Sequence, residues 1–168
     1  DYCSPNSIPP HFIEAAKQAG YVENPDFNGL NQEGVGMYQV THKNGERHSA
    51  AKAYVTPNIS RPNLTVITNA HTTRVLLEGK RAIGVEFNQQ GNVKILHAKR
   101  EVILCAGALQ SPQILMLSGI GPAAQLQTHG IEVLHDLPGV GENLQDHIDV
   151  VQIFNAPELK DTFGLSLV

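Results

Sequence analysis

The middle of the chain alternates apolar and polar residues in the way that strands with one buried face do. The segments TTRVLL (72–77), AIGVEF (82–87) and VKILHA (93–98) are rich in β-branched and apolar residues, which in the first two fall at every second position. Short connections that contain glycine, EGK (78–80) and QQGN (89–92), separate them. Because strands joined by such short turns pair with reversed direction, the pattern predicts an antiparallel meander.

The first part of the chain predicts short elements joined by loops. A helix is expected to begin at Pro9 or Pro10 and to end before Gly20, because proline favours the first turn and glycine the position past the end. Asn44-Gly45 is typical of a tight turn. We further expect a loop at 24–36, an extended segment at 37–43, a short helix at 49–55 ended by Pro57, and a β-rich segment at 64–68.

Residues 101–107 (EVILCAG) break the alternation with a continuous apolar run. Such a run is typical of a strand buried on both faces in a parallel sheet covered by helices. Cys105 lies within the run, so we expect a buried, inert thiol. Ser111-Pro112 matches the N-cap and first residue of a helix. We expect helices at 112–118 and 121–130, ended by Gly119 and Gly130, then a strand at 131–137 and a turn at 138–144.

These elements predict a mixed α/β (α+β) fold, in which an antiparallel β-meander lies beside a buried parallel-type strand with short helices. The chain has 168 residues, of which 41% are hydrophobic, so it can form a packed core. A net charge of −4 argues against a nucleic-acid-binding face, which needs a basic surface. No apolar run approaches the roughly 20 residues that span a bilayer. We therefore expect a cytoplasmic protein without a transmembrane segment or a nucleic-acid partner.

The most informative local unit is the run Ala106-Gly107-Ala108 between the expected buried strand and the following helix. Small residues at the carboxyl end of a parallel strand allow close approach of the backbone to a ligand, often a nucleotide. The alternative is a strand-to-helix turn that needs small residues only for packing. Residues 119–124 (GIGPAA) fit G-x-G-x-x-G/A literally, but a helix precedes them, so they are not a dinucleotide fingerprint.

The sequence predicts neither a metal site nor a nucleophilic hydrolase. None of the eight histidines stands in H-x-H, H-x-x-x-H or H-E-x-x-H spacing. No G-x-S-x-G elbow is present. Asp146-His147 places a carboxylate beside an imidazole, which we interpret as a structural hydrogen bond.

The stretch GALQSPQILMLSGIG (107–121) resembles the second signature of the glucose–methanol–choline (GMC) oxidoreductases at fixed spacing. Further segments follow in family order: DFNG (26–29), EGVGMYQVT (33–41), GERHSAAKAYV (45–55), RPNLTV (61–66), RAIGVEF (81–87) and PGVGENLQDH (138–147). The chain is most similar to bacterial choline-dehydrogenase-like members. The resemblance implies an FAD-dependent flavoprotein that oxidises an alcohol to an aldehyde by hydride transfer to the flavin.

The resemblance also implies which residues bind the cofactor. Thr72 occupies a position that meets the adenine through its backbone, although valine is common there. Ala106 and Gly107 correspond to the turn beside the adenosine portion, and Ser111 shapes the helix that follows. The resemblance further implies that Asn28, in the DFNG loop on the substrate-domain side, lies near the cofactor. No catalytic residue is assigned, because the family's active-site histidine has no counterpart here.

The chain looks like the middle third of a longer enzyme. Residues 1–60 would enter the substrate domain and its linker, 61–147 would form part of the FAD-binding domain, and 148–168 would begin the substrate domain. We expect the isolated chain to bind FAD weakly or not at all, to have no turnover, and to self-associate through exposed apolar segments, with 101–107 the foremost. A small-molecule alcohol and an electron acceptor are the partners expected of the full enzyme, and peripheral attachment to the inner membrane stays open.

Two other functions stay open beside this one. The chain could be a complete, non-catalytic nucleotide-binding module. It could also be a structural or interaction domain derived from such an enzyme. The alcohol, and the choice of oxygen or a quinone as acceptor, are not determined by the sequence.

Overall fold

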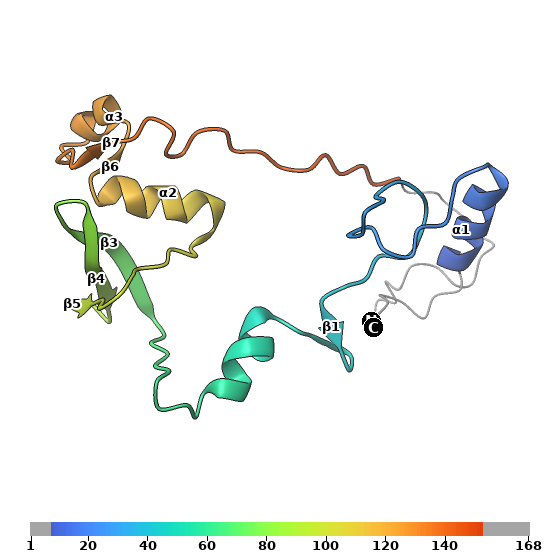
Figure 1. The fold of residues 1–168 in the computed structure, drawn as a ribbon, viewed down its shortest axis with the longest axis horizontal. Helices are drawn as coiled ribbons and strands as arrows, with labels where there is room; N and C mark the ends of the chain where they lie inside the picture. Colours follow the sequence, from blue (N-terminus) through green and yellow to red (C-terminus); the bar gives the residue numbers. More distant parts are fainter. Residues whose placement is uncertain (1–7, 153–168) are drawn as a thin grey trace. The chain divides into compact units, whose positions relative to one another are not determined.

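The computed structural model describes residues 8–152, which form two compact units (Figure 1). The first unit holds residues 8–65 together with 151 and 152, and the second holds 66–150. Within 8–152, no helix combines the length and the apolar character that crossing a bilayer requires.

The first unit contains short elements around a long loop. Helix α1 spans Ile8–Gln18, and Gly20 follows it at φ +95°, as predicted for a glycine past the helix end. Asn44 and Gly45 both have positive φ, which confirms the predicted tight turn. The turn joins strands β1 (His42–Lys43) and β2 (Glu46–Arg47), after which a π-helical turn η1 (Ala51–Val55) continues into a 3-10 turn η2 (Thr56–Asn58).

The helix expected at 49–55 is therefore present in another form. It is a π-helical turn, and Pro57 lies inside the 3-10 turn that follows instead of ending the helix. Proline is tolerated there because the first residues of a helical turn have no intrahelical partner for an N–H group.

The second unit is built on the predicted meander. Strands β3 (Ala70–Glu78), β4 (Arg81–Gln89) and β5 (Asn92–His97) pair antiparallel in the order β3-β4-β5. Val75 faces Val85 across the β3–β4 pair, and Thr72 faces Phe87. The segment 64–68 is not a strand, because its backbone has no ladder partner among the described residues and β3 begins only at Ala70.

Helix α2 (Gly107–Leu117) packs against β3 and builds the core of the second unit (Figure 1). Val75, Phe87 and Ile114 are buried where the meander meets α2. The chain then forms β6 (Ile120–Gly121), α3 (Ala123–Thr128) and β7 (His135–Asp136), with β6 and β7 parallel. Leu126 on α3 has only 1% of its surface exposed.

The expectations for the start of α2 and for the segment after α3 also need correction. Helix α2 begins at Gly107, so Ser111 is not its N-cap and Pro112 lies inside it. The Ser111 Oγ instead reaches back from inside the helix and accepts a hydrogen bond from the Ala106 N–H at 3.1 Å. Helix α3 and Gly130 at φ +66° confirm the third helix, whereas the strand expected at 131–137 is reduced to β7.

The apolar segment 101–107 is the largest departure from the predicted elements. It forms no strand, and no described segment pairs with its backbone. Ile103 has 72% of its surface exposed, and Cys105 is exposed rather than buried. A strand needs hydrogen-bonding neighbours and a buried strand needs two covered faces. Residues 8–152 supply no pairing strand here, and they cover only Val102, Leu104 and Ala106, each in part. The mixed α/β class, with antiparallel sheet and short helices, is nevertheless confirmed.

Candidate functional site

The bend before α2 is the first component of the candidate site. Ala106 caps the helix, and Gly107 follows at φ +85°, a conformation that glycine adopts without steric cost. A Cβ atom added at Gly107 would meet no other atom within 4 Å, so the backbone here is accessible. The hydrogen bond from the Ala106 N–H to Ser111 Oγ holds the bend in place.

A pocket of about 310 Å³ lies between β3 and α2. It brings together two of the four residues predicted to bind a cofactor, Thr72 and Ala106, from distant parts of the sequence. Gly107 and Ser111 do not line it, but they shape the bend that carries Ala106. The lining residues are Ala70, His71, Thr72, Ala106, Gln110, Gln113, Ile114 and Leu117.

Strand β3 forms one wall of this pocket and one edge of the meander. Half of the backbone groups of an edge strand point away from its single partner and can bind something else. The pairing with β4 shifts register between Thr72 and Arg74, which marks a bulge beside Thr72. A bulge of this kind re-aims the chain next to a site, as it does at many active sites.

The bulge is held by side chains on the two strands. The Thr73 hydroxyl donates to Glu86 Oε1 at 2.7 Å, and Arg74 Nη2 donates to Glu86 Oε2 at 2.8 Å. The Arg74 guanidinium, with the Thr73 hydroxyl, lowers the pKa of the Glu86 carboxyl below its usual value of 4.5. Glu86 is therefore held as a carboxylate that ties the bulged part of β3 to β4.

Gln110 and Gln113 also line the pocket, although the sequence interpretation did not select them. Their spacing was the available signal, because residues at i and i+3 lie on the same side of a helix. The spacing alone does not show which side of α2 faces the pocket. The structure shows it, because Ala106 and Leu117 line the same pocket as the two glutamines.

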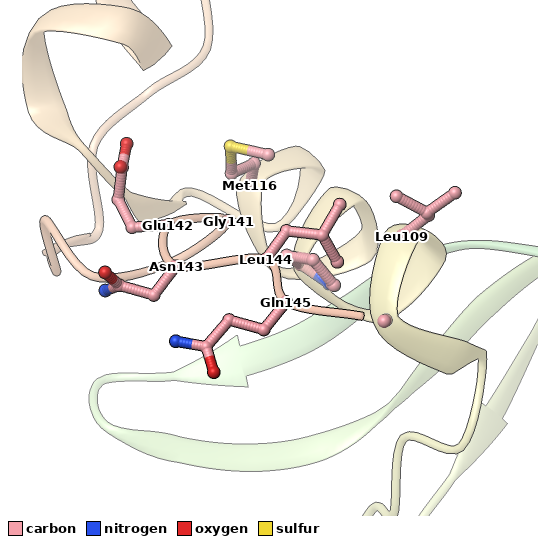
Figure 2. A pocket seen from close by; sticks show the side chains of 9 residues that line it. Leu109, Met116, Gly141, Glu142, Asn143, Leu144 and Gln145 are labelled. Carbon is pink, nitrogen blue, oxygen red and sulfur yellow. The ribbon is translucent and has the colours of Figure 1, made fainter. Parts of the chain in front are cut away.

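A second pocket, of about 610 Å³, lies on another side of α2 (Figure 2). Leu109 and Met116 of the helix line it together with the segment 141–145. Figure 2 shows Glu142, Asn143 and Gln145 on an irregular segment, neither helix nor strand, that runs beside α2. Residues 143–145 form no hydrogen bond with any described residue, so this wall is not fixed in the way that the smaller pocket's walls are. None of the four predicted cofactor residues lies in it.

The other sequence candidates lie outside these pockets. Asn28 belongs to the first unit, where its backbone N–H donates to Asp26 Oδ1 at 3.0 Å. Asp146 accepts a hydrogen bond from the backbone N–H of His147 at 2.8 Å. Gly119 ends α2 at φ +82° and does not form a phosphate loop. Within residues 8–152, no group of three or more His, Cys, Asp or Glu side chains could hold a metal ion.

Comparison with known proteins identifies the family. The family model described as GMC oxidoreductase matches residues 2–149. The chain belongs to the GMC oxidoreductase family. The resemblance found in residues 107–121 and the segments around them is therefore confirmed.

This GMC oxidoreductase chain has curated relatives that are much longer. It is 51% identical over 148 residues to the alcohol dehydrogenase (acceptor) of Pseudomonas putida, a match that covers 86% of this chain and 27% of that enzyme. It is 50% identical over 139 residues to the oxygen-dependent choline dehydrogenase of Brucella anthropi, covering 83% of this chain and 25% of that enzyme. The chain thus spans about a quarter of the length of these relatives.

A solved structure supports the same assignment at the level of the fold. An FAD-dependent oxidoreductase from Chaetomium thermophilum superimposes with a TM-score of 0.72 at 29% sequence identity. The match covers 82% of this GMC oxidoreductase chain and 25% of the other.

Proposed function

We propose that this chain forms the adenosine-side wall of an FAD site in a GMC enzyme that oxidises an alcohol to an aldehyde. The observation that carries the proposal is the pocket between β3 and α2, which Thr72 and Ala106 line together. The family resemblance independently implies a cofactor-binding position for each of these two residues. The similarity to the FAD-dependent oxidoreductase from Chaetomium thermophilum supports the choice of cofactor.

The residues present fit the adenosine end of a dinucleotide. A volume of about 310 Å³ lies at the lower end of the roughly 300–1,000 Å³ of small-molecule pockets, so it suits one end of FAD and not the whole molecule. Ile114 and Leu117 supply an apolar surface for a flat ring, and the edge of β3 supplies backbone donors and acceptors. The accessible backbone at Gly107, next to the pocket-lining Ala106, allows close approach of a ligand beside the pocket.

When bound, FAD supplies the redox chemistry, by accepting a hydride from the alcohol carbon. In this proposal the chain's own residues bind and orient the adenosine end and shield it from water. We assign no catalytic residue in the chain, and we expect no turnover by the 168-residue polypeptide alone. A choline-like alcohol is the proposed substrate class, because a relative is named as a choline dehydrogenase.

The domain division is part of the same proposal. Residues 61–147 would belong to the FAD-binding domain, with 1–60 and 148–168 leading into the substrate domain. We propose a cytoplasmic location for the protein. Cell fractionation would show whether it is also attached to the inner membrane. Self-association through the exposed segment 101–107 is proposed on its exposure and apolar character.

Calorimetric titration with FAD and ADP tests the proposal on this chain and on the same chain extended to the length of its relatives. We expect tight, stoichiometric FAD binding only by the extended polypeptide. Tight FAD binding by the 168 residues alone would instead support a complete nucleotide-binding module. An extended polypeptide that folds and binds no FAD would overturn the proposal in favour of a structural or interaction domain.

A further inference from the structure

The sequence contains two Asn-Gly pairs, Asn28-Gly29 and Asn44-Gly45, and the structure holds them in different ways. Glycine after asparagine leaves its backbone nitrogen open to the asparagine side chain, because glycine has no Cβ atom to shield it. In such a pair the glycine nitrogen can attack the side-chain amide carbon, which is the first step of deamidation. Whether a given pair reacts depends on how firmly the fold holds that nitrogen.

Asn44-Gly45 is the less constrained of the two pairs. Both residues are exposed, and they form the tight turn between β1 and β2 at φ +54° and φ +78°. Within residues 8–152, no hydrogen bond engages the Gly45 N–H or the Asn44 side chain, and a Cβ atom added at Gly45 would meet no other atom within 4 Å. The hairpin pairs only two residues of each strand, so little structure has to give way when the turn changes conformation.

Asn28-Gly29 is held more firmly. The Gly29 N–H donates to the Asp26 carbonyl at 3.1 Å, and the Asn28 N–H donates to Asp26 Oδ1 at 3.0 Å. Gly29 also packs against that carbonyl, since an added Cβ atom would lie 3.2 Å from the Asp26 oxygen. The nitrogen that would have to lose its proton and attack is therefore already engaged as a donor. The buried Asn24 side chain ties the same loop down by accepting from the Asp26 N–H at 2.9 Å.

We propose that Asn44 is the preferred site of spontaneous deamidation in this chain, and that the hydrogen bonds around Gly29 protect Asn28. In the reaction, the Gly45 nitrogen loses its proton and bonds to the Asn44 Cγ atom, while the Cγ–Nδ2 bond breaks and ammonia leaves with that proton. Water then opens the resulting succinimide ring at either carbonyl, which yields aspartate or isoaspartate. The reaction consumes no oxidant or reductant, and water is its only co-reactant.

The modification changes the hairpin in two ways. Both products carry a carboxylate beside Glu46, whose side chain forms an ion pair with Lys52 of η1. Isoaspartate also routes the backbone through the former side chain, so the longer turn no longer matches the pairing of Lys43 with Glu46. This inference is independent of the proposed function, because neither Asn44 nor Gly45 lines the pocket between β3 and α2.

The first measurement is peptide mapping by mass spectrometry after incubation of the purified 168-residue chain in water labelled with heavy oxygen. The label marks each residue hydrolysed during the incubation, and electron-transfer fragmentation separates isoaspartate from aspartate. We expect Asn44 to convert about tenfold faster than Asn28, because a hydrogen bond that must first break contributes about the free energy that changes a rate tenfold. Equal rates, or a faster reaction at Asn28, would overturn the inference.

The same comparison in guanidinium chloride tests whether the fold causes the difference between the two pairs. Unfolding breaks the hydrogen bond from the Gly29 N–H to the Asp26 carbonyl, so the rates at Asn28 and Asn44 should approach each other. A rate ratio that keeps its native value after unfolding would assign the preference to the neighbouring residues in the sequence. That result would contradict the protective role of the hydrogen bonds.

The second measurement uses the variant Asn24→Ala, which removes the side-chain bonds that tie down the loop around Asp26. We expect deamidation of Asn28 to accelerate several-fold, while the rate at Asn44 in the same molecule stays unchanged and serves as the internal reference. Asn44→Gln is the matched control, because the longer glutamine side chain deamidates far more slowly, and it should leave Asn28 at its wild-type rate. An Asn28 rate that Asn24→Ala does not alter would refute protection by the fold.

Discussion

Ser118 joins helix α2 to the meander through the backbone of Val75. The Ser118 Oγ accepts a hydrogen bond from the Val75 N–H at 2.8 Å and donates one to the Ile114 carbonyl at 2.6 Å. Ser118 is buried, and so are the side chains of Val75 and Ile114. Because α2 and β3 are the two walls of the candidate pocket, this one hydroxyl holds those walls at a set separation.

Replacing Ser118 with alanine should destabilise the second unit. The Val75 N–H would lose its acceptor in a buried position, which costs about 1–3 kcal/mol. Urea unfolding followed by circular dichroism measures the change. Ser60→Ala is the matched control, because Ser60 is exposed and bonds to none of the described residues, and its unfolding midpoint should stay unchanged. Equal midpoints for the two variants would show that the Ser118 hydroxyl is dispensable.

Gly107→Ala should be less stable than the wild-type chain. Gly107 has φ +85°, and a left-handed conformation costs an L-residue with a Cβ atom roughly 1–2 kcal/mol. The open space around the position leaves backbone conformation as the only cause of the loss. Gly139→Ala is the control, since Gly139 has equally open surroundings without a positive φ. Thermal unfolding of both variants measures the difference, and a neutral Gly107→Ala would contradict the strain argument.

The carboxylate of Glu86 should make stability depend on pH below about 4.5. Its pKa is lower in the folded chain than the usual value of 4.5, mainly because of the hydrogen bond from Arg74. The stabilisation is therefore fully present above pH 4.5 and is lost as the pH falls through the lower, folded-state pKa. Glu86→Gln should unfold at lower urea than wild type at neutral pH.

The difference in urea midpoint between wild type and Glu86→Gln should shrink as the pH falls below about 4.5, because the wild-type Glu86 side chain then also becomes neutral. Urea midpoints at a series of pH values measure it. Glu132→Gln serves as control, since Glu132 forms no ion pair with the described residues. A difference that is constant with pH would show that the charge of Glu86 does not stabilise the fold.

The Asn24 side chain should hold the loop at 24–36 in its folded conformation. Its buried amide donates to the Asn31 carbonyl at 2.7 Å and the Glu33 carbonyl at 3.2 Å, and its Oδ1 accepts from the Asp26 N–H at 2.9 Å. Asn24→Ala removes all three bonds, so limited proteolysis should cut within the loop several times faster. Asn28→Ala is the control, because the Asn28 side chain is exposed. Similar cleavage rates in both variants would oppose this role.

Ile103→Lys should reduce self-association of the chain. Ile103 lies with 72% of its surface exposed in an apolar segment that no described residue pairs with, and a charge there opposes edge-to-edge association. Sedimentation velocity over a concentration series measures the shift toward monomer. Leu30→Lys is the control, since Leu30 is exposed among polar neighbours. A wild-type chain that is monomeric at high concentration would refute the premise.

Local features of the fold were predictable because neighbouring residues encode them. Alternation along 72–77 and 82–87, together with the short glycine-containing connections, predicts the meander, and Asn44-Gly45 predicts the tight turn between β1 and β2. The start of α2 was not predictable in this way. Ser111 is a common N-cap residue, but here it lies inside the helix, where its hydroxyl accepts a hydrogen bond from the Ala106 N–H.

Burial was the property that the sequence could least determine. The apolar run at 101–107 resembles a buried strand, and yet Ile103 and Cys105 are exposed. The apolar character of a segment sets how much free energy its burial would contribute. Whether the segment is buried depends on another part of the fold that pairs with its backbone and packs on its side chains. No described strand of this chain pairs with residues 101–107, and the segment is covered only in part.

The sequence by itself determined the family signature at 107–121 and the meander, and the family resemblance led to the proposal that Thr72 and Ala106 bind one ligand. Only the tertiary structure decided that these two residues line one pocket and that Gln110 and Gln113 share it. The physical reason is that a pocket is made by packing between elements distant in sequence. Here the packing is that of α2 on β3, and a buried hydroxyl at Ser118 bridges the two.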